Sequence, residues 1–507
     1  MATETVSLPS SEPITPTQRL SILHGPVDPP LVDLSLGELL ELQTYHHGTK
    51  ECIVIPWTGT RWTYNDLNQQ TLLLAQALLN QGIGVGDRVG IMAGNCEQYA
   101  AVFFAVARIG AILVILNNTY TPTEAMYALK FSDCKIFFTT QKIGRLDNGR
   151  LLADVKSQAP NIKVFMLRGE AGPYQTYNDL IKSSARQSLD ALHHAMSKVV
   201  PHQVCNLQFT SGTTGLPKAA MLTHHSLVNN ARFIGDRMRL TPADILCCPP
   251  PLFHCFGLVL GLLSVVTHGA KIVYPAAVFD VPATLSAILD ERCTALHGRL
   301  TTVGTLMPHA QAKIVDRDGK IVPLGTRGEL CMAGYQLQAG YWNNSEKTNE
   351  VMVRDAAGTL WLHTGDEAVF DEDGYCTITG RFKDIIIRGG ENIYPLEIEE
   401  RLLAHETITQ AIVVGLKDEH YGEVVAAFLQ RAEGAAATAR LSDQDIKAWV
   451  RQTLGGHKSP SHVFWLGEDG VPADVPLTGS GKVRKFEMAR AGEEILKTRK
   501  GVVAAKL

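Results

Sequence analysis

The spacing of apolar residues changes along the chain, and each pattern predicts a different kind of structure. Over 63–82 the apolar side chains fall on one helical face, so we expect a helix that Thr63 caps. The run "DRVGIMAG" (87–94) then predicts a buried strand, and further helix and strand patterns follow it. Repeated strand-helix-strand units predict a parallel sheet covered by helices. The same alternation resumes over 204–298.

Short strands with tight turns replace this alternation from about Lys313. The stretches 312–325 and 369–380 each contain an Asp-Gly dipeptide, which supplies the left-handed residue of a hairpin turn. They predict an antiparallel or barrel-like section. Beyond residue 380, two apolar runs and a helix capped by Ser442 predict a further unit of mixed class.

We therefore expect an α/β protein with two parts. The first is a large N-terminal region (1–379) of parallel, helix-covered sheets with a small barrel-like β section. The second is a small α+β domain (380–507). The length of 507 residues agrees with at least two units, since domains usually hold roughly 100 to 200 residues.

Composition and charge exclude several classes of protein. Apolar residues make up 45% of the chain and charged residues 19%, which excludes a disordered protein. The formal charge of −4 gives no broad attraction for nucleic acid, so we expect no nucleic-acid partner. The most apolar stretches, 99–116 and 256–266, are interrupted by charge or too short to span a bilayer, so we expect no transmembrane protein.

Three features bear on the cellular compartment. The ten cysteines include no CxxC pair, which favours a reducing, intracellular setting. The N-terminal residues form neither a signal peptide nor a transit peptide. The last three residues, Ala-Lys-Leu (505–507), differ by one small residue from the Ser-Lys-Leu tripeptide that a peroxisomal import receptor reads. We expect a peroxisomal protein, or a cytoplasmic one if this match arose by chance.

The segment with the clearest chemical meaning reads "FTSGTTGLPKAAMLTH" (209–224). Its glycines let backbone N–H groups approach phosphate oxygens, and its hydroxyls and lysine add donors. The P-loop spacing GxxxxGK[ST] is absent, so this is another kind of polyphosphate loop. A flexible surface turn is the alternative, but apolar residues precede the loop and a helical pattern follows it. The candidate binding residues are Thr210, Ser211, Gly212, Thr213, Thr214, Gly215 and Lys218.

This loop resembles the phosphate loop of the adenylate-forming enzymes, the superfamily of acyl-CoA synthetases, peptide-synthetase adenylation domains and beetle luciferases. Five further stretches resemble motifs of that family, in the family's order. They are "PPPLFHCFG" (249–257), "GELCMAGYQLQAGYW" (328–342), "LHTGD" (362–366), "GRFKDIIIRGGENIYPLEIEE" (380–400) and "LTGSGKVRKFEM" (477–488).

The resemblance implies an acyl-CoA ligase that uses ATP, Mg²⁺ and coenzyme A. In such enzymes a carboxylate attacks the α-phosphate of MgATP to give acyl-adenylate and pyrophosphate, and a thiol then displaces AMP. No carrier-protein domain follows Lys482, which favours free coenzyme A as the thiol. The implied substrate is a carboxylic acid of fatty acid or secondary metabolism.

Three residues in the matched stretches have implied roles in binding and chemistry. Asp366 lies in a TGD turn, where its carboxylate can accept hydrogen bonds from both ribose hydroxyls, and Arg381 follows a strand within reach of ribose or phosphate. Lys482 matches the lysine that contacts the α-phosphate and the substrate carboxylate, so it is the catalytic candidate. The alternatives are an aspartate that satisfies its own turn and ordinary surface cations.

The resemblance also implies roles for residues around these three. Lys383 matches the hinge about which the small domain turns between the two half-reactions. Gly389 and Gly390 would present backbone to the pantetheine arm of coenzyme A, although a glycine pair is more often a turn. Phe253 and His254 match the acyl pocket, although a histidine on an apolar background is as often a core residue.

One stretch, "CTALHGRLTTVGT" (293–305), departs from the family pattern. The family has a long segment here that carries elements of the second sheet, a glycine-rich stretch against adenine and an aromatic-Gly-x-Thr-Glu motif. The threonine of that motif contacts phosphate and its glutamate holds Mg²⁺. No such motif occurs in this chain, so several dozen residues are missing between Gly298 and Arg299, and we assign no metal ligand.

Two explanations fit this departure. Either the chain is a shortened product of a gene whose full version is a working ligase, or it is a degenerate pseudoenzyme that still binds nucleotide or coenzyme A. Retention of Lys482, Asp366, Arg381 and the complete phosphate loop favours the first. A luciferase-like reaction is a third hypothesis, because it shares the adenylation motifs.

Overall fold

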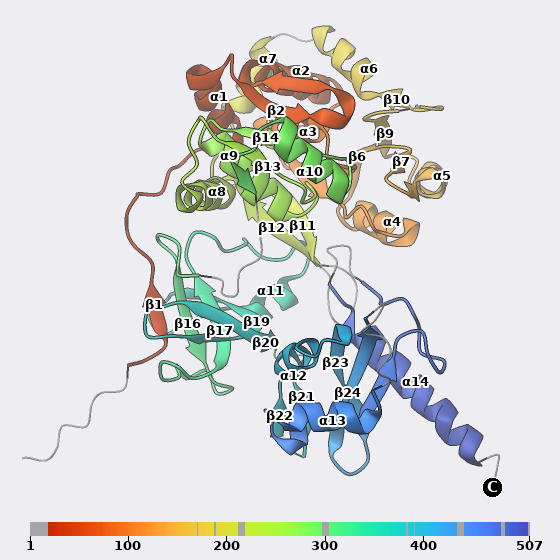
Figure 1. Cartoon of the computed structure of the whole chain (residues 1–507). Coiled ribbons are helices and arrows are strands. Elements are labelled where there is room, and N and C mark those ends of the chain that lie inside the picture. Colours follow the sequence, from red (N-terminus) through yellow and green to blue (C-terminus); the bar gives the residue numbers. More distant parts are fainter. Residues whose placement is uncertain are drawn as a thin grey trace, which may run out of the picture.

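The structure is a computed structural model that describes residues 19–169, 171–186, 189–210, 218–296, 304–381, 384–389, 391–432, 441–477 and 482–504. Within these ranges the chain forms a lobe of two helix-covered sheets, a barrel-like sheet and a small domain. In Figure 1 the lobe runs from red to green, most of the barrel-like sheet is green to teal, and the small domain is blue. The expected α/β fold class, with a β section and a small α+β domain, is confirmed.

Seven strands form the first sheet, in the order β10-β9-β6-β4-β5-β11-β12. The central strand β4 pairs in parallel with both β5 and β6, as the strand-helix-strand pattern predicts. The strands are β4 (Arg88–Met92), β5 (Ile112–Ile115), β6 (Cys134–Thr139), β9 (Lys163–Met166), β10 (Gln175–Thr176), β11 (Val204–Thr210) and β12 (Lys218–Thr223), and a short hairpin of β7 (Lys142–Ile143) and β8 (Leu146–Asp147) stands apart.

Five strands form the second sheet, in the order β15-β13-β14-β2-β3. All neighbours are parallel except β2 and β3, which form an antiparallel pair at one edge. At the other edge lies β15, which contributes two residues. The strands are β2 (Glu51–Ile55), β3 (Thr60–Thr63), β13 (Ile245–Cys247), β14 (Lys271–Val273) and β15 (Ala295–Leu296).

Helices cover these sheets and begin at caps that the sequence displays. Thr63 accepts the N–H of Asp66 at the start of α2, as expected, and Leu67, Leu74 and Leu78 of that helix are fully buried. The helices of the lobe are α1 (Leu36–His47), α2 (Tyr64–Asn80), α3 (Glu97–Arg108), α4 (Pro122–Phe131), α5 (Gly149–Gln158), α6 (Tyr177–Lys182), α7 (Leu189–Met196), α8 (His224–Met238), α9 (Ser264–Thr267) and α10 (Val281–Asp290), with a π-helical segment at Phe256–Leu263 and short 3₁₀ turns at Pro56–Thr58 and Ser183–Arg186.

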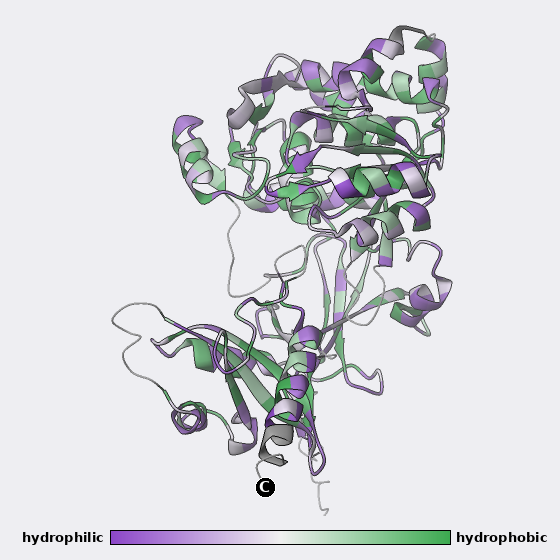
Figure 2. Cartoon of the chain, turned by 90° about the vertical axis from the view of Figure 1, so that its right-hand side faces the viewer, coloured by the Kyte–Doolittle hydropathy of each residue, from purple (hydrophilic) through white to green (hydrophobic). Residues whose placement is uncertain are grey.

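Helix α3 is the centre of the core. It contacts strands of both sheets, and its side chains from Tyr99 to Arg108 are buried. The guanidinium of Arg108 is compensated by Glu41, at 2.6 Å, and by Asn68. Figure 2 shows apolar residues concentrated on the strands and polar residues on the outer sides of helices. Both apolar stretches noted in the sequence are therefore buried elements, and no helix in the described ranges has the length and apolar character to cross a membrane.

The element after the phosphate loop differs from the expectation of a helical pattern. Strand β12 comes first and only then α8, so the loop connects two antiparallel strands. The apolar run of β12 is paired on both edges, because Met221 also donates to the Gly340 carbonyl (2.9 Å) and Trp342 to the Ala219 carbonyl (2.8 Å). Backbone pairing on two sides stabilises an extended conformation over a helix here.

The barrel-like sheet has the order β1-β16-β17-β19-β18, with β20 paired to β19. The expected hairpin of residues 369–380 is confirmed, since β19 and β20 pair antiparallel. Sequence reasoning missed β1, which joins this sheet from far upstream. The elements are β1 (Ile22–His24), β16 (Gln311–Val315), β17 (Gly328–Ala333), α11 (Ser345–Val351), β18 (Met352–Arg354), β19 (Leu360–Phe370) and β20 (Cys376–Arg381).

The small domain has helices on both faces of one sheet, ordered β22-β21-β24-β23 with β25 beside β24. Ile398 and Ile446 pack on one face, and Met488 on the other. The predicted boundary at 379/380 stays a prediction, with β20 ending at Arg381. The elements are β21 (Ile386–Arg388), β22 (Glu391–Ile393), α12 (Pro395–Leu403), β23 (Ile408–Asp418), β24 (Gly422–Arg431), α13 (Asp443–Arg451), a 3₁₀ turn (Gly456–Lys458), β25 (His462–Trp465) and α14 (Lys485–Ala504).

Candidate functional site

The two ends of the phosphate loop lie side by side. Thr210 ends β11 and Lys218 begins β12, and the two are register partners, with the Thr210 hydroxyl donating to the Lys218 carbonyl at 3.3 Å. The Lys218 ammonium lies 5.4 Å from the ring centroid of Tyr341, a cation–π contact. Five predicted members of the loop, Ser211, Gly212, Thr213, Thr214 and Gly215, lie outside the described residues.

Asp366 and Arg381 form an ion pair at the end of the barrel-like sheet. They are register partners on β19 and β20, and Arg381 Nε donates to Asp366 Oδ1 at 3.0 Å. Both side chains keep solvent access, with 31% of Asp366 and 46% of Arg381 exposed. The second carboxylate oxygen and the remaining guanidinium nitrogens can therefore contact a ligand. The structure brings together the two residues that the sequence assigned to ribose and phosphate.

The turn that carries Asp366 is held by Glu329 of β17, a residue to which sequence reasoning gave no role. One oxygen of Glu329 accepts from His363 Nδ1 at 2.8 Å, and the other accepts the N–H of Gly365 at 3.1 Å. Gly365 has a φ of +71°, a conformation that favours glycine. Glu329 therefore fixes the turn from the neighbouring strand. In the sequence, the only indication that Glu329 matters was its position in the stretch 328–342, which resembles a family motif.

Cys331 lies beside this pair, with its sulfur 3.5 Å from His363 Nδ1. These groups are close enough together to share a metal ion. Burial, followed by the charge of Glu329, raises the pKa of the Cys331 thiol to about 12, so the thiolate that a metal requires is disfavoured. The hydrogen bonds to His363 and Gly365 account for Glu329 without a metal.

We predict that Glu329→Gln raises the Kd for AMP about tenfold. The amide keeps one acceptor but places an NH₂ against one of the two donors, which costs about 1–1.5 kcal/mol of turn stability. Titration calorimetry with AMP measures this effect. Glu346→Gln, at an exposed position of α11, is the matched control and should leave the Kd unchanged. A lowered Tm with an unchanged Kd in Glu329→Gln would mean that Glu329 supports the sheet and not the site.

The small domain approaches the barrel-like sheet next to this turn. Tyr394, which precedes α12, contacts buried Glu367, the residue after Asp366. Burial and the hydrogen bond with Glu367 raise the pKa of Tyr394 to about 12. The Arg327 guanidinium lies 5.4 Å from the centre of the tyrosine ring. The hinge candidate Lys383 lies outside the described residues, and Tyr394 is a downstream residue that contacts the Asp366 strand.

Lys482 of the small domain acts electrostatically on His254, a residue predicted for the acyl pocket. Desolvation by surrounding protein, and then the positive charge of Lys482, lower the pKa of His254 below its usual value. Two residues beyond Lys482, the guanidinium of Arg484 lies 3.8 Å from Glu124 of α4, a second link between the small domain and the lobe. The charge of Lys482 thus reaches the "LFHCFG" stretch, although the two lie more than 200 residues apart in the chain.

Phe253 and His254 occupy different environments in this stretch. Phe253 is buried in the core of the lobe, whereas His254 is exposed and its Nδ1 accepts the N–H of Phe256 at 3.1 Å. The exposed ring excludes the interpretation of His254 as an ordinary core histidine. Because its pKa is lowered, the imidazole is neutral at pH 7.

The predicted coenzyme A residues are described in part. Gly389 ends the strand β21 with a φ of +59°, and its N–H donates to the Tyr421 carbonyl at 2.8 Å. The positive φ shows that Gly389 lies in a turn, which was the alternative to a role in binding coenzyme A. A turn residue can still contact a ligand through its backbone. Gly390 lies outside the described residues.

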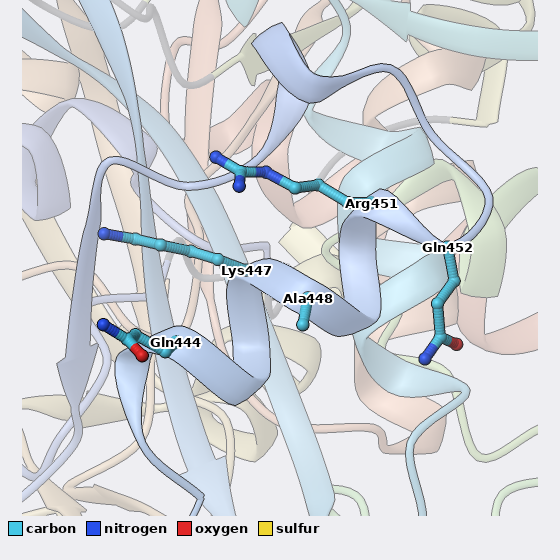
Figure 3. Close-up of a pocket in the computed structure, with 5 residues that line it drawn as sticks. All are labelled: Gln444, Lys447, Ala448, Arg451 and Gln452. Carbon is cyan, nitrogen blue, oxygen red and sulfur yellow. The ribbon is translucent and has the colours of Figure 1, made fainter.

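A surface hollow on α13 lies apart from all these residues. It is lined by Gln444, Lys447, Ala448, Arg451 and Gln452, and Figure 3 shows the longer side chains of Gln444, Lys447 and Arg451 extending to one side of the helix. It contains none of the candidate site residues. Most of its lining is exposed, so we assign it no role.

Comparisons with known proteins identify the family and the fold. The family model described as AMP-binding enzyme matches residues 40–299 and 297–342, and the model described as AMP-binding enzyme C-terminal domain matches 397–482. Acyl-CoA ligase sidI of Beauveria bassiana is 66% identical in an alignment 564 residues long that spans 97% of this chain and 97% of the relative. Acyl-CoA ligase sidI of Aspergillus fumigatus is 50% identical over 96% of each chain.

Solved structures show the same fold at lower identity. ATP-bound MatB from Rhodopseudomonas palustris is similar with a TM-score of 0.76 and 22% identity, over 91% of this chain and 100% of that chain. The anthranilate CoA ligase AuaEII in complex with anthranoyl-AMP is similar with a TM-score of 0.77 and 20% identity, over 92% and 98%.

Proposed function

The chain belongs to the AMP-binding enzyme family and is an ATP-dependent, AMP-forming acyl-CoA ligase, and on this premise we propose that Lys482 stabilises the reacting phosphate. In the first half-reaction a carboxylate oxygen of the acid attacks the α-phosphorus, and the bond to pyrophosphate breaks. In the second, the coenzyme A sulfur attacks the acyl carbonyl carbon and AMP leaves. Negative charge grows on the phosphate oxygens in the first step, where a fixed ammonium stabilises it.

The single observation that carries this proposal is the nearness of Lys482 to His254. The charge of Lys482 acts on the imidazole, and the ion pair between Arg484 and Glu124 of α4, at 3.8 Å, supports a position of this part of the small domain against the lobe. A carboxylate held between the two would be near the ammonium and beside a neutral imidazole. This geometry supports adenylation rather than a surface role for Lys482.

The remaining groups divide the nucleotide between them in this proposal. The phosphate loop, from Thr210 to Lys218, binds the phosphates, Asp366 binds the ribose hydroxyls, and Arg381 binds ribose or α-phosphate. Mg²⁺ is proposed to arrive bound to ATP, and no described side chain is assigned to it. Coenzyme A is proposed to pass Gly389 and Gly390 after a rotation of the small domain at Lys383.

We propose a carboxylic acid of fatty acid or secondary metabolism as the substrate. Solved relatives with this fold are described with acids as different as anthranilate and o-succinylbenzoate, and another is a fatty acyl CoA synthetase. The fold therefore accommodates many acids, and the pocket around His254 decides among them. ATP–pyrophosphate exchange with a panel of fatty, aromatic and hydroxy acids tests this, in a chain that carries the segment proposed below to be missing after Gly298. One acid class should exceed acetate by more than tenfold, and equal exchange with all would contradict a defined pocket.

We further propose that the 507-residue chain is a shortened form of a working ligase. The alignment with the Beauveria bassiana relative runs over 564 residues, more than this chain contains, so the relative has residues without a counterpart here. The two family matches meet at 297–299, at the proposed junction. The comparisons give no support to a pseudoenzyme. The gene sequence between the codons for Gly298 and Arg299 tests this proposal, because it should contain an in-frame stretch that encodes an aromatic-Gly-x-Thr-Glu motif.

Peroxisomal import is proposed from the C-terminal Ala-Lys-Leu, which lies outside the described residues. We predict that deletion of Lys506 and Leu507 moves a fluorescently tagged chain from peroxisomes to the cytosol. Fluorescence microscopy with a peroxisomal marker measures the distribution. The matched control replaces Lys497, on the exposed part of α14, by alanine and should remain peroxisomal. Unchanged import of the deletion variant would sink the localisation proposal.

A further inference from the structure

Helix α10 presents a stripe of large apolar side chains to solvent. Val281, Leu285 and Leu289 follow one another at four-residue intervals and are 53%, 59% and 76% exposed. Residues at this spacing share one face of a helix. Nearby, Phe279 and Leu296 are exposed as well. We call these five residues the α10 face.

The opposite part of α10 is packed in the ordinary way. Thr284 and Ala287 are buried, and Ala287 contacts the buried valines Val54 and Val273 of the second sheet. The apolar arc of α10 is therefore wider than the part that this sheet covers. In α2, by contrast, the leucines of the apolar face are fully buried. The sequence of α10 is that of a helix with partners on two sides.

The edge of the second sheet beside this helix is also incomplete among the described residues. Strand β15 pairs in parallel with β13 along one edge, and no described strand pairs with its other edge. Parallel sheets are ordinarily buried and continued or covered at their edges. The α10 face and this open edge adjoin the point, after Leu296, where the two family matches meet.

The relatives carry a segment between the positions of Gly298 and Arg299. We propose that this segment packs on the α10 face and on the free edge of β15. The inference rests on the proposed function, because it takes the 507-residue chain to be a shortened form. The alignment with the Beauveria bassiana relative is longer than this chain, so the relative has residues that could cover this surface. The two family matches meet at 297–299, which places these residues next to β15. In the shortened form these apolar groups are in contact with water.

The test uses one pair of substitutions in two chains. Leu285→Gln/Leu289→Gln is introduced into the 507-residue protein and into a chain in which the segment of the Beauveria bassiana relative is restored after Gly298. Leu189→Gln, at an exposed leucine of α7, is the matched control in both. Thermal unfolding and fluorescence of the dye 8-anilinonaphthalene-1-sulfonate are the readouts.

In the 507-residue protein we expect the pair to lower dye fluorescence at least twofold and to leave Tm within about 2 °C, because the leucines are exposed. In the restored chain we expect low dye fluorescence and a fall in Tm of several degrees, because the same leucines are then buried. The control should have neither effect. If the short protein does not remain folded, the restored chain alone decides, by the presence or absence of the fall in Tm.

Three results would overturn the inference. The pair could leave the Tm of the restored chain unchanged, or it could destabilise the 507-residue protein as much as the restored one. The third is a dimer of the 507-residue protein that the pair dissociates in sedimentation, which would make a second copy the occupant. ATP–pyrophosphate exchange separates this inference from the proposed function. If the restored chain catalyses exchange but the leucine pair does not lower its Tm, the ligase proposal holds and the inference about the α10 face is wrong. If the pair lowers the Tm but no exchange occurs, the inference holds and the ligase proposal is wrong.

Discussion

Replacement of Lys482 by alanine is expected to slow ATP–pyrophosphate exchange about 10²- to 10³-fold in the chain that carries the restored segment. A preorganised donor at the site of developing charge contributes about 3–4 kcal/mol to transition-state stabilisation. Lys482 is the cation whose charge acts on His254, a residue of the proposed acyl pocket. Because its ammonium interacts mainly with the transferring phosphate, the loss should be in kcat rather than in the KM for ATP.

The matched control for this variant is Lys497→Ala, which removes an exposed lysine from α14 in the same domain. It should exchange at the parent rate. Lys482→Arg keeps the charge but not the shape, so it should recover only part of the activity. If Lys482→Ala lowers the exchange rate by less than fivefold, Lys482 is an ordinary surface lysine and not the catalytic residue.

Replacement of Asp366 by alanine is expected to raise the Kd for AMP by more than about 100-fold. Hydrogen bonds from ribose hydroxyls to a carboxylate contribute about 1.5–3 kcal/mol each, and Arg381 loses its partner at the same time. Titration calorimetry with AMP measures the change. Removal of the 2′-hydroxyl, in 2′-deoxy-AMP, should weaken binding to the parent but not to the variant if that hydroxyl is one of the two donors.

Asp373→Ala, in the exposed turn between β19 and β20, is the matched control for Asp366→Ala. It should bind AMP like the parent. A variant at Asp366 with parental AMP affinity would support the alternative that this carboxylate only completes its own turn.

Local patterns predicted the parts of the fold that depend on neighbouring residues. The caps of α2 at Thr63 and of α13 at Ser442 were readable because a cap and its acidic partner lie three residues apart. The hairpin of β19 and β20 was readable from its Asp-Gly turn. The pairing of β12 with residues 339–342 was not, since its partner strand lies about 120 residues away in the chain.

The candidate site shows the same limit of local reasoning. The TGD turn identified Asp366, but its ion pair with Arg381 follows from the register of β19 and β20. Glu329 supports that turn from β17 across a β-bulge, so no spacing in the sequence reveals it. The influence of the Lys482 charge on His254 depends on how the small domain packs on the lobe. Motifs name the residues, and tertiary packing brings them together.

The exposure of the α10 face could not be predicted from the sequence alone. Its leucines follow an ordinary amphipathic spacing, and only their exposed areas distinguish them from those of α2. Their position next to β15 connects this exposure with the departure at Gly298 and Arg299. On our proposal, one missing segment at this junction explains both the absent family motif and the uncovered apolar surface.

The rate of ATP–pyrophosphate exchange in two matched chains tests the central claim most directly. One is the 507-residue protein, and the other carries the relatives' segment between Gly298 and Arg299. The account predicts exchange in the restored chain that Lys482→Ala abolishes, and at least 100-fold slower exchange in the 507-residue protein. Equal exchange by both chains, or none by a folded restored chain, would contradict the claim that this sequence is a shortened form of a working ligase.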